Sequence, residues 1–452
     1  MPEPPARRSA ALFALGLALL APARAQTPPA SGLQHTFAPF VDATAWPLPD
    51  LDALSAASGA RGFVLGFLVN DGQTAARPCT PKWGGFDPYY ATAAQAAAGG
   101  GEVHLLAEVD QLRAAGGRVM VSFGGAANVP LAATCPSAQA LADAYASVVD
   151  TYGVHDLDFD IEGTWVADAA SRARRVAGLV LLQQMRPAVR VWFTLPVLPT
   201  GLDANGVSTL NEAVAGGVDL AGVNVMAMDY GGAAAPDPSR LGEYAIGAMT
   251  GLHGQIRTAY ASAGRPLTDG AAWSMVGVTP MIGVNDVPAE VFTLGHAAEV
   301  MAFAVEHRIG LVSMWSVNRD LPCPGGPSPW PQTTCSSVAQ DPYAFSALFR
   351  QMDASTATAG GPVRSAGAEL LAPHPNPTHG AAAVAFVLAA PAGVRLGLYD
   401  ALGRRVALLA DGVRAAGRHE VALGVLGRLP AGVYVLRLDG AGVPLSRRVV
   451  VH

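Results

Sequence analysis

Short apolar runs rich in β-branched residues alternate with longer, alanine-rich amphipathic segments between Thr36 and about Phe349. Such runs are typical of parallel strands that are buried on both faces. We expect these strands: Phe37–Ala43, Gly62–Val69, Arg118–Phe123, Asp156–Glu162, Val189–Pro196, Leu220–Met228, Met275–Ile282 and Gly310–Trp315. The intervening segments predict helices, among them Ser137–Tyr152, Ala167–Met185, Gly242–Ala261 and Ala297–His307.

Eight strand–helix units in roughly 300 residues predict an α/β fold, a (β/α)8 TIM barrel. A doubly wound open sheet is the alternative. We see no glycine-rich dinucleotide fingerprint after the first expected strand, which favours the barrel. We expect the barrel domain to span residues 26–352.

The composition changes after Met352. Residues 353–370 are predicted as a linker, because Asp353–Gly367 is rich in Ala, Thr, Gly and Ser. Residues 371–452 are predicted as a small all-β sandwich, since short strand-like runs are separated by turn signals such as Asp411-Gly412 and Asp439-Gly440. The expected strands are Ala382–Leu388, Val394–Tyr399, Arg405–Leu409, His419–Leu423, Gly432–Leu438 and Ser446–Val450.

The first 25 residues have the features of a secretory signal peptide. Two arginines precede an apolar run from Ala10 to Leu20, and Ala23-Arg24-Ala25 is a small-x-small cleavage site. A membrane anchor is the alternative, but the run is short for a bilayer, and no later stretch is long enough. We therefore predict a protein exported through the periplasm, secreted or attached to the cell surface, with no membrane span after cleavage.

The overall composition narrows the function classes. The chain has 452 residues, 51% of them hydrophobic, which is ample for a large core. Its formal net charge of -6 argues against a nucleic-acid partner, because such proteins usually carry a basic face. Nothing in the sequence indicates a cofactor.

The four cysteines predict disulfides, because export places the chain in an oxidising compartment. Cys323 and Cys335 enclose a loop rich in Pro and Gly, so we expect them to pair locally. Cys79 would then pair with Cys135. A metal site is the alternative, but the chain has no CxxC motif and no clustered histidines.

One expected strand, His155 to Gly163, has the sequence HDLDFDIEG, in which acids and apolar residues alternate. Side chains on a strand alternate between faces, so Asp158, Asp160 and Glu162 share one face. A solvent-facing surface is the usual meaning of such a pattern, but barrel strands are covered on their outer side. We therefore expect the acids inside the barrel, with Glu162 at the C-terminal mouth, where barrel enzymes place catalysis.

This spacing suggests acid catalysis. Next-but-one side chains on a strand lie roughly 6–7 Å apart, so the carboxyl groups affect each other's ionisation. A glutamic acid kept protonated near neutrality is a general acid, suited to protonating a leaving-group oxygen in glycoside hydrolysis. A Mg²⁺ or Ca²⁺ site is the chemical alternative, because clustered carboxylates also bind hard cations.

The stretch resembles the DxxDxDxE signature of family-18 glycoside hydrolases, the chitinases and their relatives. Asp158, Asp160 and Glu162 match the last three acids, whereas His155 stands at the first position and Asp156 one place late. Other motifs follow in the family's order over about residues 36–350. They are Ser122-Phe123-Gly124-Gly125 (SxGG, third strand), Met226–Gly232 (MxYD, sixth strand) and Trp315 (end of the eighth strand).

The resemblance implies a retaining, substrate-assisted mechanism. Glu162 would protonate the glycosidic oxygen, Asp160 would orient the substrate's 2-acetamido group, and Asp158 would hold and tune Asp160. Met228 stands at the usual Tyr position of the sixth-strand motif, and Tyr230 either replaces that donor or is ordinary packing. The implied substrate-binding residues are Asp229, Tyr230, Met226, Trp315, Gly124 and Gly125.

The function that the resemblance implies is that of a secreted chitinase acting on β-1,4-linked N-acetylglucosamine, with chitin or chitooligosaccharides as the substrate. A non-hydrolytic chitin-binding protein on the same barrel is one alternative. An endo-β-N-acetylglucosaminidase acting on N-glycans is another, because it shares the motif. A metal-dependent hydrolase is the most distant alternative.

The C-terminal unit resembles a sorting domain of the bacterial type IX secretion pathway. The resemblance rests on Asn376-Pro377, on Leu398–Val406 (LYDALGRRV) and on Ala431–Leu438 (AGVYVLRL). It implies the type IX machinery as a partner. A carbohydrate-binding sandwich is the alternative, but it would want exposed aromatic residues, and the aromatic residues here fall within strand-like runs: Phe386, Tyr399 and Tyr434.

Overall fold

The computed structural model describes residues 35–72, 76–287, 289–356, 363–365, 368–371, 373–376, 378, 382–400, 404–440 and 445–451. The predicted signal peptide lies outside the described residues, as does part of the predicted linker. Among the residues described, no helix is both long and apolar enough to cross a membrane.

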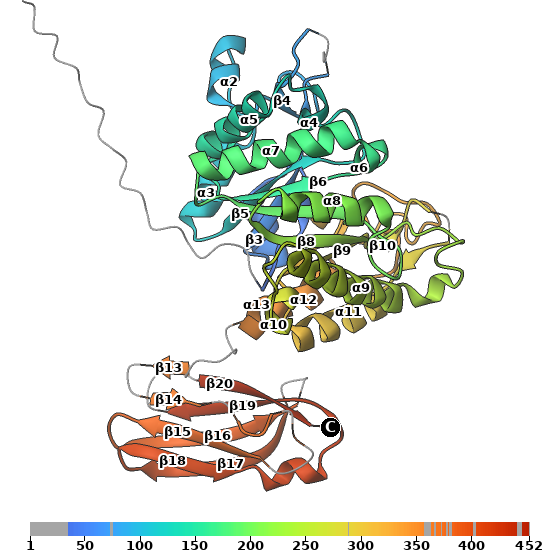
Figure 1. The fold of residues 1–452 in the computed structure, drawn as a ribbon. Coiled ribbons are helices and arrows are strands. Elements are labelled where there is room, and N and C mark those ends of the chain that lie inside the picture. The colour runs from blue at the N-terminus through green and yellow to red at the C-terminus, as the bar shows by residue number, and fades with distance from the viewer. Residues whose placement is uncertain are drawn as a thin grey trace, which may run out of the picture.

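The described part of the N-terminal unit contains a closed barrel of eight parallel strands (Figure 1). The first strand is split into β1 (Thr36–Phe37) and β2 (Phe40–Asp42). Because β1 pairs with the last strand and β2 with the second, the sheet closes on itself. The others follow in chain order: β3 (Gly62–Asn70), β5 (Arg118–Gly124), β6 (Asp156–Asp160), β7 (Arg190–Pro196), β8 (Leu220–Ala227), β9 (Val276–Pro280) and β12 (Leu311–Val312). The predicted strands and barrel are confirmed.

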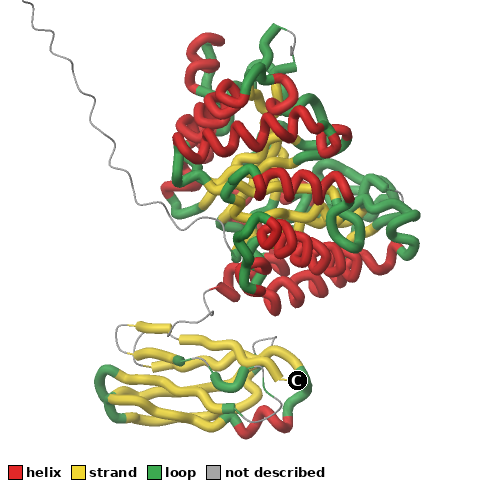
Figure 2. The backbone as a smooth tube through the Cα atoms, in the orientation of Figure 1, coloured by secondary structure: helices red, strands yellow, loops and turns green. Residues whose placement is uncertain are grey.

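Helices surround the barrel, as Figure 2 shows with strands in yellow and helices in red. The longer ones are α1 (Leu51–Ser58), α3 (Leu106–Ala114), α5 (Ala138–Tyr152), α7 (Ala169–Met185), α8 (Ala204–Ala215), α9 (Leu241–Ser262) and α11 (Leu294–His307). The shorter ones are α2 (Ala93–Gly99), α4 (Leu131–Thr134), α6 (Thr164–Ala167), α10 (Asp269–Trp273), α12 (Ala344–Phe349), α13 (Gln351–Thr356) and the 3-10 turns η1 (Pro238–Arg240) and η2 (Val317–Arg319).

Local sequence explains where these helices begin and end. The Ser137 side chain accepts a hydrogen bond from the backbone N–H of Ala140 at the start of α5, which satisfies one of the free N–H groups there. Gly153 ends the same helix in the left-handed conformation that glycine adopts most readily.

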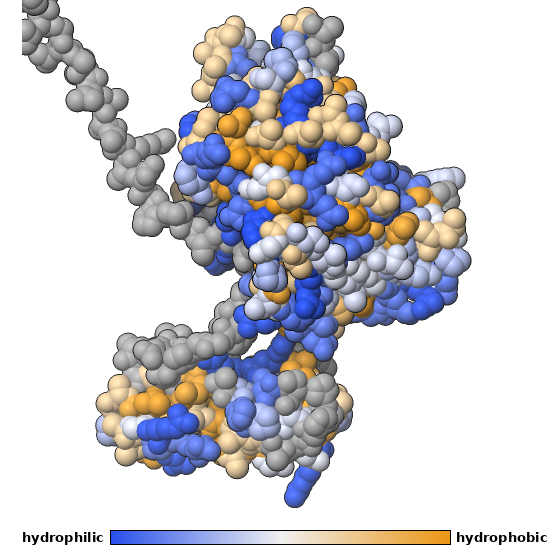
Figure 3. Space-filling model, in the orientation of Figure 1, coloured by the Kyte–Doolittle hydropathy of each residue, from blue (hydrophilic) through white to orange (hydrophobic). Residues whose placement is uncertain are grey.

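The outer surface formed by the helical layer mixes hydrophilic and apolar residues on the face shown in Figure 3.

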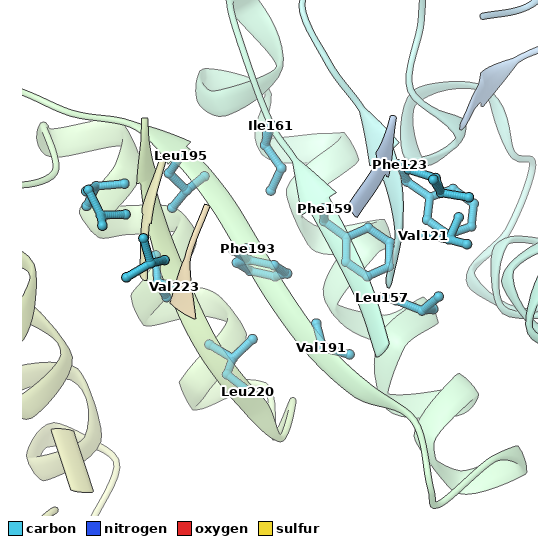
Figure 4. Packing of buried hydrophobic residues seen from close by; sticks show 14 of the residues in the cluster. Val121, Phe123, Leu157, Phe159, Ile161, Val191, Phe193, Leu195, Leu220 and Val223 are labelled. Atoms are coloured by element: carbon cyan, nitrogen blue, oxygen red, sulfur yellow. The ribbon is translucent and has the colours of Figure 1, made fainter. Parts of the chain in front are cut away.

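The main core lies between the barrel wall and the helices. Phe159 of β6 packs against Phe123 of β5 and Tyr145 of α5, with ring centroids 5.4 and 5.0 Å away. Figure 4 shows the outward-facing side chains of β6, of Ile161 directly after it, and of β7, namely Leu157, Phe159, Ile161, Val191, Phe193 and Leu195. The alternate residues of β6 therefore face the barrel interior, as predicted.

A second, smaller apolar cluster fills part of the barrel interior. The Trp192 ring occupies space that Gly222 leaves free on the next strand, where a Cβ atom would collide with the indole. The buried residues of this cluster are Ala38, Phe40, Val64, Met120, Trp192 and Leu311. On the mouth side of this cluster the inward-facing side chains include buried polar residues, and the site lies there.

Both expected disulfides are present, between Cys79 and Cys135 and between Cys323 and Cys335. They tie down loops outside the regular repeat. Cys79 lies in the excursion that ends in β4 (Pro81–Trp83), which pairs with β3. The second disulfide closes the loop after β12, next to a hairpin formed by β10 (Gly283–Val284) and β11 (Val291–Phe292).

The described part of the C-terminal unit forms two antiparallel sheets with their own apolar core, which confirms an all-β fold. One sheet contains β13 (Val363–Ser365), β14 (Ala368–Leu370), β15 (Ala383–Leu388) and β18 (Gly417–Ala422). The other contains β17 (Arg405–Arg414), β16 (Ala392–Tyr399), β19 (Gly432–Gly440) and β20 (Leu445–Val451), and the 3-10 turn η3 (Gly424–Arg428) precedes β19.

Two details differ from expectation. Strand pairing begins at Val363, inside the segment predicted as linker. There β13 pairs with β14, and β14 pairs with β15. The turns expected at Asp411-Gly412 and Asp439-Gly440 are wrong, since β17 and β19 run through these residues while paired with β16. Asn376 has a structural role: its side chain donates to the Arg448 carbonyl and accepts from the Val450 N–H, which ties it to β20.

Candidate active site

A ladder of carboxyl groups runs along the inner face of β6 toward the barrel mouth. Asp158 and Asp160 are buried, with exposed fractions of 1% and 6%. Glu162 follows directly after the strand and is partly exposed. The structure therefore brings the three predicted catalytic residues together, in the order the alternation implied.

Asp158 is held by hydroxyl groups from both neighbouring strands. Ser122 Oγ donates to Asp158 Oδ2 and Thr194 Oγ1 donates to Oδ1, each over 2.6 Å. Burial raises the pKa of Asp158 to about 7, and these hydrogen bonds oppose that rise because they stabilise the carboxylate. Asp158 can thus exchange a proton near neutral pH.

The hydrogen bonds continue around the barrel beyond Thr194. Asn224 Nδ2 on β8 donates to Thr194 Oγ1 over 3.0 Å and to Thr279 Oγ1 on β9 over 2.6 Å. Because Thr194 Oγ1 accepts from Asn224, its hydroxyl proton is free to donate to Asp158. The chain of donors therefore has a fixed direction that ends on the carboxylate.

Asp160 carries the most strongly raised pKa of the ladder. Burial is the main cause, followed by the negative charges of Glu162 and Asp158. A side-chain hydrogen bond with Glu162 raises the pKa of Asp160 further and lowers that of Glu162. Its Oδ1 atom has no hydrogen-bond partner among the described residues and is poised to take one.

Glu162 occupies the mouth position expected of a general acid. Burial raises its pKa, and the charge of Asp229 raises it further, while the hydrogen bond with Asp160 lowers it. A carboxyl group that stays protonated toward neutral pH is suited to donating a proton to a leaving group. Across the described part of the chain, no group of three or more His, Cys, Asp or Glu side chains is arranged to hold a metal ion.

Gly124 and Gly125 let β5 approach the ladder. Gly124 has φ +115°, and a Cβ atom there would collide with the Asp160 carbonyl oxygen. Gly125 has φ +85°, donates its N–H to the same carbonyl over 3.0 Å, and lies against the Phe67 ring. Gly124 and Gly125 were expected to contact the substrate. In the structure, they allow the backbone to pack closely around Asp160.

Asp229 and Tyr230 follow β8 but point differently. Asp229 lies in the left-handed region with φ +50° and is close enough to Glu162 to raise its pKa. The ring of Tyr230 packs on Tyr244 of α9, with centroids 6.0 Å apart, and its buried hydroxyl has no partner among the described residues. The contacts of Tyr230 thus match the packing alternative. Met226 is buried on β8.

Trp315 lies where the chain continues from β12 toward the mouth. Its ring stacks on Phe67 with centroids 5.5 Å apart and meets the edge of Phe40 at 6.0 Å. The indole is only partly buried. A flat apolar face fixed by two aromatic rings is suited to one face of a sugar ring.

The structure also explains the irregular start of the acidic motif. His155 is exposed, whereas Asp156 is buried on the same face as Asp158 and forms an ion pair with Arg190 of β7, Nε to Oδ1 at 2.8 Å. The inward acid at this end of β6 is therefore Asp156. Strand parity carried this signal, because position 156 shares its face with 158, 160 and 162.

Sequence reasoning missed three site residues: Thr194, Asn224 and Thr279. A signal was present, because each is a polar residue within an otherwise apolar parallel strand.

A closed barrel of this kind, with a proton-sharing carboxyl ladder at its mouth, defines the class of barrel glycoside hydrolases.

Comparisons with known proteins support this class. The chain is 40% identical over 336 residues to "Probable bifunctional chitinase/lysozyme" of Escherichia coli (strain K12), covering 72% of this chain and 35% of the relative. It is 38% identical over 310 residues to "Endochitinase 11" of Metarhizium anisopliae, covering 66% of this chain and 55% of the relative. The chain thus spans between a third and about half of these two relatives. No family model matches the chain.

Among solved structures, the chain resembles active domain 2 of a thermostable chitinase from Pyrococcus furiosus, in a catalytic-site mutant complexed with chito-oligosaccharides. The identity is 30%, the TM-score is 0.62, and the match covers 73% of this chain and 97% of that domain. The chain belongs to the chitinases of glycoside hydrolase family 18.

Proposed function

We propose that the protein is a secreted chitinase that hydrolyses β-1,4-linked N-acetylglucosamine polymers with retention of configuration. The observation that carries the proposal is the Asp158–Asp160–Glu162 ladder, in which burial raises the pKa of each carboxyl group and the last residue stands at the mouth. Two buried acids with raised pKa values behind a partly exposed third suit proton transfer to a bound substrate.

The ladder supports a two-step reaction. Glu162 donates its proton to the glycosidic oxygen while the substrate's own acetamido oxygen attacks the anomeric carbon, which releases the leaving sugar and forms an oxazolinium ion. Asp160 turns toward the acetamido N–H and stabilises its positive charge, and Asp158 accepts the proton that Asp160 gives up. Glu162 then takes a proton from the water that opens the oxazolinium, so the configuration is retained.

Other residues suit a polymeric sugar. Trp315 would form the floor beneath the sugar at the cleavage point, and Asp229 would contact the substrate from the β8 side. Trp46, Phe86 and Trp330 are exposed by 83%, 56% and 66%, and they lie on loops that follow the C-terminal ends of barrel strands. Exposed aromatic rings on this side of the barrel favour a long carbohydrate over a small soluble ligand.

Comparing Glu162→Gln with the wild type on chitin oligomers of defined length tests the proposal. Glu299→Gln makes the same change at an exposed glutamate on α11 and is the control. We expect loss of hydrolysis only in Glu162→Gln. Equal activity in all three proteins would overturn the proposal, and oligomer binding without product at every pH would favour a non-hydrolytic binder. Preferential cleavage of a high-mannose glycopeptide would favour an endo-β-N-acetylglucosaminidase.

We further propose that residues 1–25 direct export and that the C-terminal sandwich is a type IX sorting domain joined by a short linker. The all-β fold and the attachment of Asn376 to β20 support the second part. Deleting residues 363–452 in a bacterium with this pathway should leave an active barrel in the periplasm. Unchanged release into the medium would contradict the sorting role, and binding of the isolated sandwich to chitin would favour the carbohydrate-binding alternative.

A further inference from the structure

The hairpin formed by β10 and β11 packs against the turn that carries Asp229. Glu290, at the start of the returning arm, is buried with an exposed fraction of 2%. Its two carboxylate oxygens accept separate backbone N–H groups, Tyr230 N at 3.1 Å and Gly231 N at 2.7 Å. A buried carboxylate between two N–H groups is costly to desolvate, and these bonds compensate that cost.

The same hairpin also holds Asp229 itself. The Asp229 N–H donates to Asn285 Oδ1 over 3.4 Å, and Val287 N–H donates to Asp229 Oδ1 over 2.8 Å. The Asn285 amide is oriented by its donation to the Met281 and Gly283 carbonyls. Three successive backbone N–H groups, of residues 229 to 231, are therefore all bound by side chains of one hairpin.

This arrangement stabilises a backbone conformation that an aspartate rarely adopts. Asp229 has φ +50°, in the left-handed region that disfavours residues with a Cβ atom. Such a conformation persists where surrounding contacts fix it. Here the fixed turn sets the position of the Asp229 carboxyl group, whose charge raises the pKa of Glu162.

A buried cation, Arg319, anchors the hairpin. Arg319, exposed by 3%, donates through Nη2 to the carbonyls of Ile282 and Val284, at 3.1 and 2.6 Å. The charged groups that face Asp229 are thus Glu162, Asp286, Glu290 and Arg319. Burial raises the pKa of Asp229 and Asp286 raises it further, whereas Arg319 lowers it.

We propose that Glu290 is a positioning residue for the reaction: it fixes the turn at residues 229–231 and so sets the place of the Asp229 carboxylate beside the general acid. The inference rests on the proposed function of Glu162. It assigns to the hairpin a role in the chemistry in addition to its role in the fold.

A double-mutant cycle with Glu290→Ala and Asp229→Asn tests this role. We expect Glu290→Ala to lower kcat/KM about 10- to 100-fold, the size of effect that misplacing a reacting group by about 1 Å produces. In the Asp229→Asn background the same change should cost less than about 3-fold, because a residue that acts through Asp229 has nothing left to position. Glu290→Gln, which keeps one acceptor oxygen, should restore part of the activity.

The pH profile separates positioning from a loss of stability. Asp229 raises the pKa of Glu162, so both Asp229→Asn and Glu290→Ala should move the alkaline limb of kcat/KM to lower pH. Asp353→Ala is the control, since this carboxylate accepts the Phe37 N–H and the Thr36 hydroxyl at the N-terminal end of β1, away from the mouth. It should lower thermal stability and leave the pH profile in place.

Additive effects in the cycle, or an alkaline limb that does not move in Glu290→Ala, would overturn the positioning role. These results are distinguishable from failure of the proposed function. That function fails if Glu162→Gln retains full activity, whereas only the role of Glu290 fails if Glu162→Gln is inactive and the cycle is additive.

Discussion

Thr194 donates its hydroxyl proton to Asp158 Oδ1 over 2.6 Å, across the boundary between β7 and β6. This hydrogen bond links Thr194, a neutral side chain without an obvious catalytic role, to Asp158, the acid of the ladder that lies furthest from the mouth. It also connects that acid to Asn224 and Thr279, so four consecutive strands contribute to one hydrogen-bonded chain.

Replacing Thr194 by valine keeps the volume and removes the donor. Because this hydrogen bond lowers the pKa of Asp158, its loss should raise that pKa further. We expect about 1–3 kcal/mol less stability toward urea and a kcat lower by about 10-fold. Thr209→Val is the matched control, since its buried hydroxyl donates to the backbone carbonyl of Asn205 on α8. Loss of activity in both variants would show that the effect is general.

The raised pKa of Asp158 predicts a pH dependence of stability. An aspartic acid with a pKa of about 7 in the folded state and about 3.9 when unfolded stabilises the fold below pH 4, and this contribution is lost as the pH rises to about 7. Asn cannot ionise, so Asp158→Asn should gain stability relative to the wild type across this window, on the order of a few kcal/mol. Urea unfolding at pH 4 and pH 7.5 measures the difference, and a constant difference would contradict it.

Gly124→Ala should damage the site through the backbone. The new Cβ would meet the Asp160 carbonyl at φ +115°, so we expect a loss of about 3 kcal/mol or more in unfolding free energy and a lower kcat. Gly116→Ala offers a control at φ +84°, where nothing lies within 4 Å of the added atom. It should cost about 1–2 kcal/mol, from backbone strain alone, and leave kcat unchanged.

Trp315→Leu keeps an apolar side chain and removes the flat ring that stacks on Phe67. If Trp315 is the sugar floor, KM for chito-oligosaccharides should rise by about 10-fold or more. Trp273→Leu removes a ring that stacks on His253 in the outer helical layer, with centroids 4.0 Å apart, and should reduce stability without changing KM. An equal KM in both variants would place the substrate elsewhere.

The sequence predicted most of the barrel because its information is local. Apolar runs revealed each strand, and the alternation in β6 fixed which face Glu162 and Asp158 occupy. The Cys323–Cys335 pair followed from its loop and the Cys79–Cys135 pair by elimination, and both were confirmed. The strand pattern and the Cys323–Cys335 pair depend on residues that are close together in the chain.

The remainder depends on contacts between distant segments. Thr194 becomes part of the site only because the register of β6 and β7 sets it beside Asp158. Nothing in the sequence distinguishes Glu290 from a surface glutamate. Its role depends on the packing of the hairpin against the turn after β8. The direction of the Tyr230 ring was open for the same reason, since α9 decides where it packs.

The split first strand links completion of the active site to closure of the barrel. Thr36 pairs with Leu311, so the ring of strands cannot close until nearly the whole barrel sequence has emerged. In the closed barrel the two acids of β6 are buried, and Trp315 packs on Phe40 and Phe67. A site that depends on this closure is complete only in the folded barrel, so two segments from opposite ends of the barrel sequence must meet before the site exists.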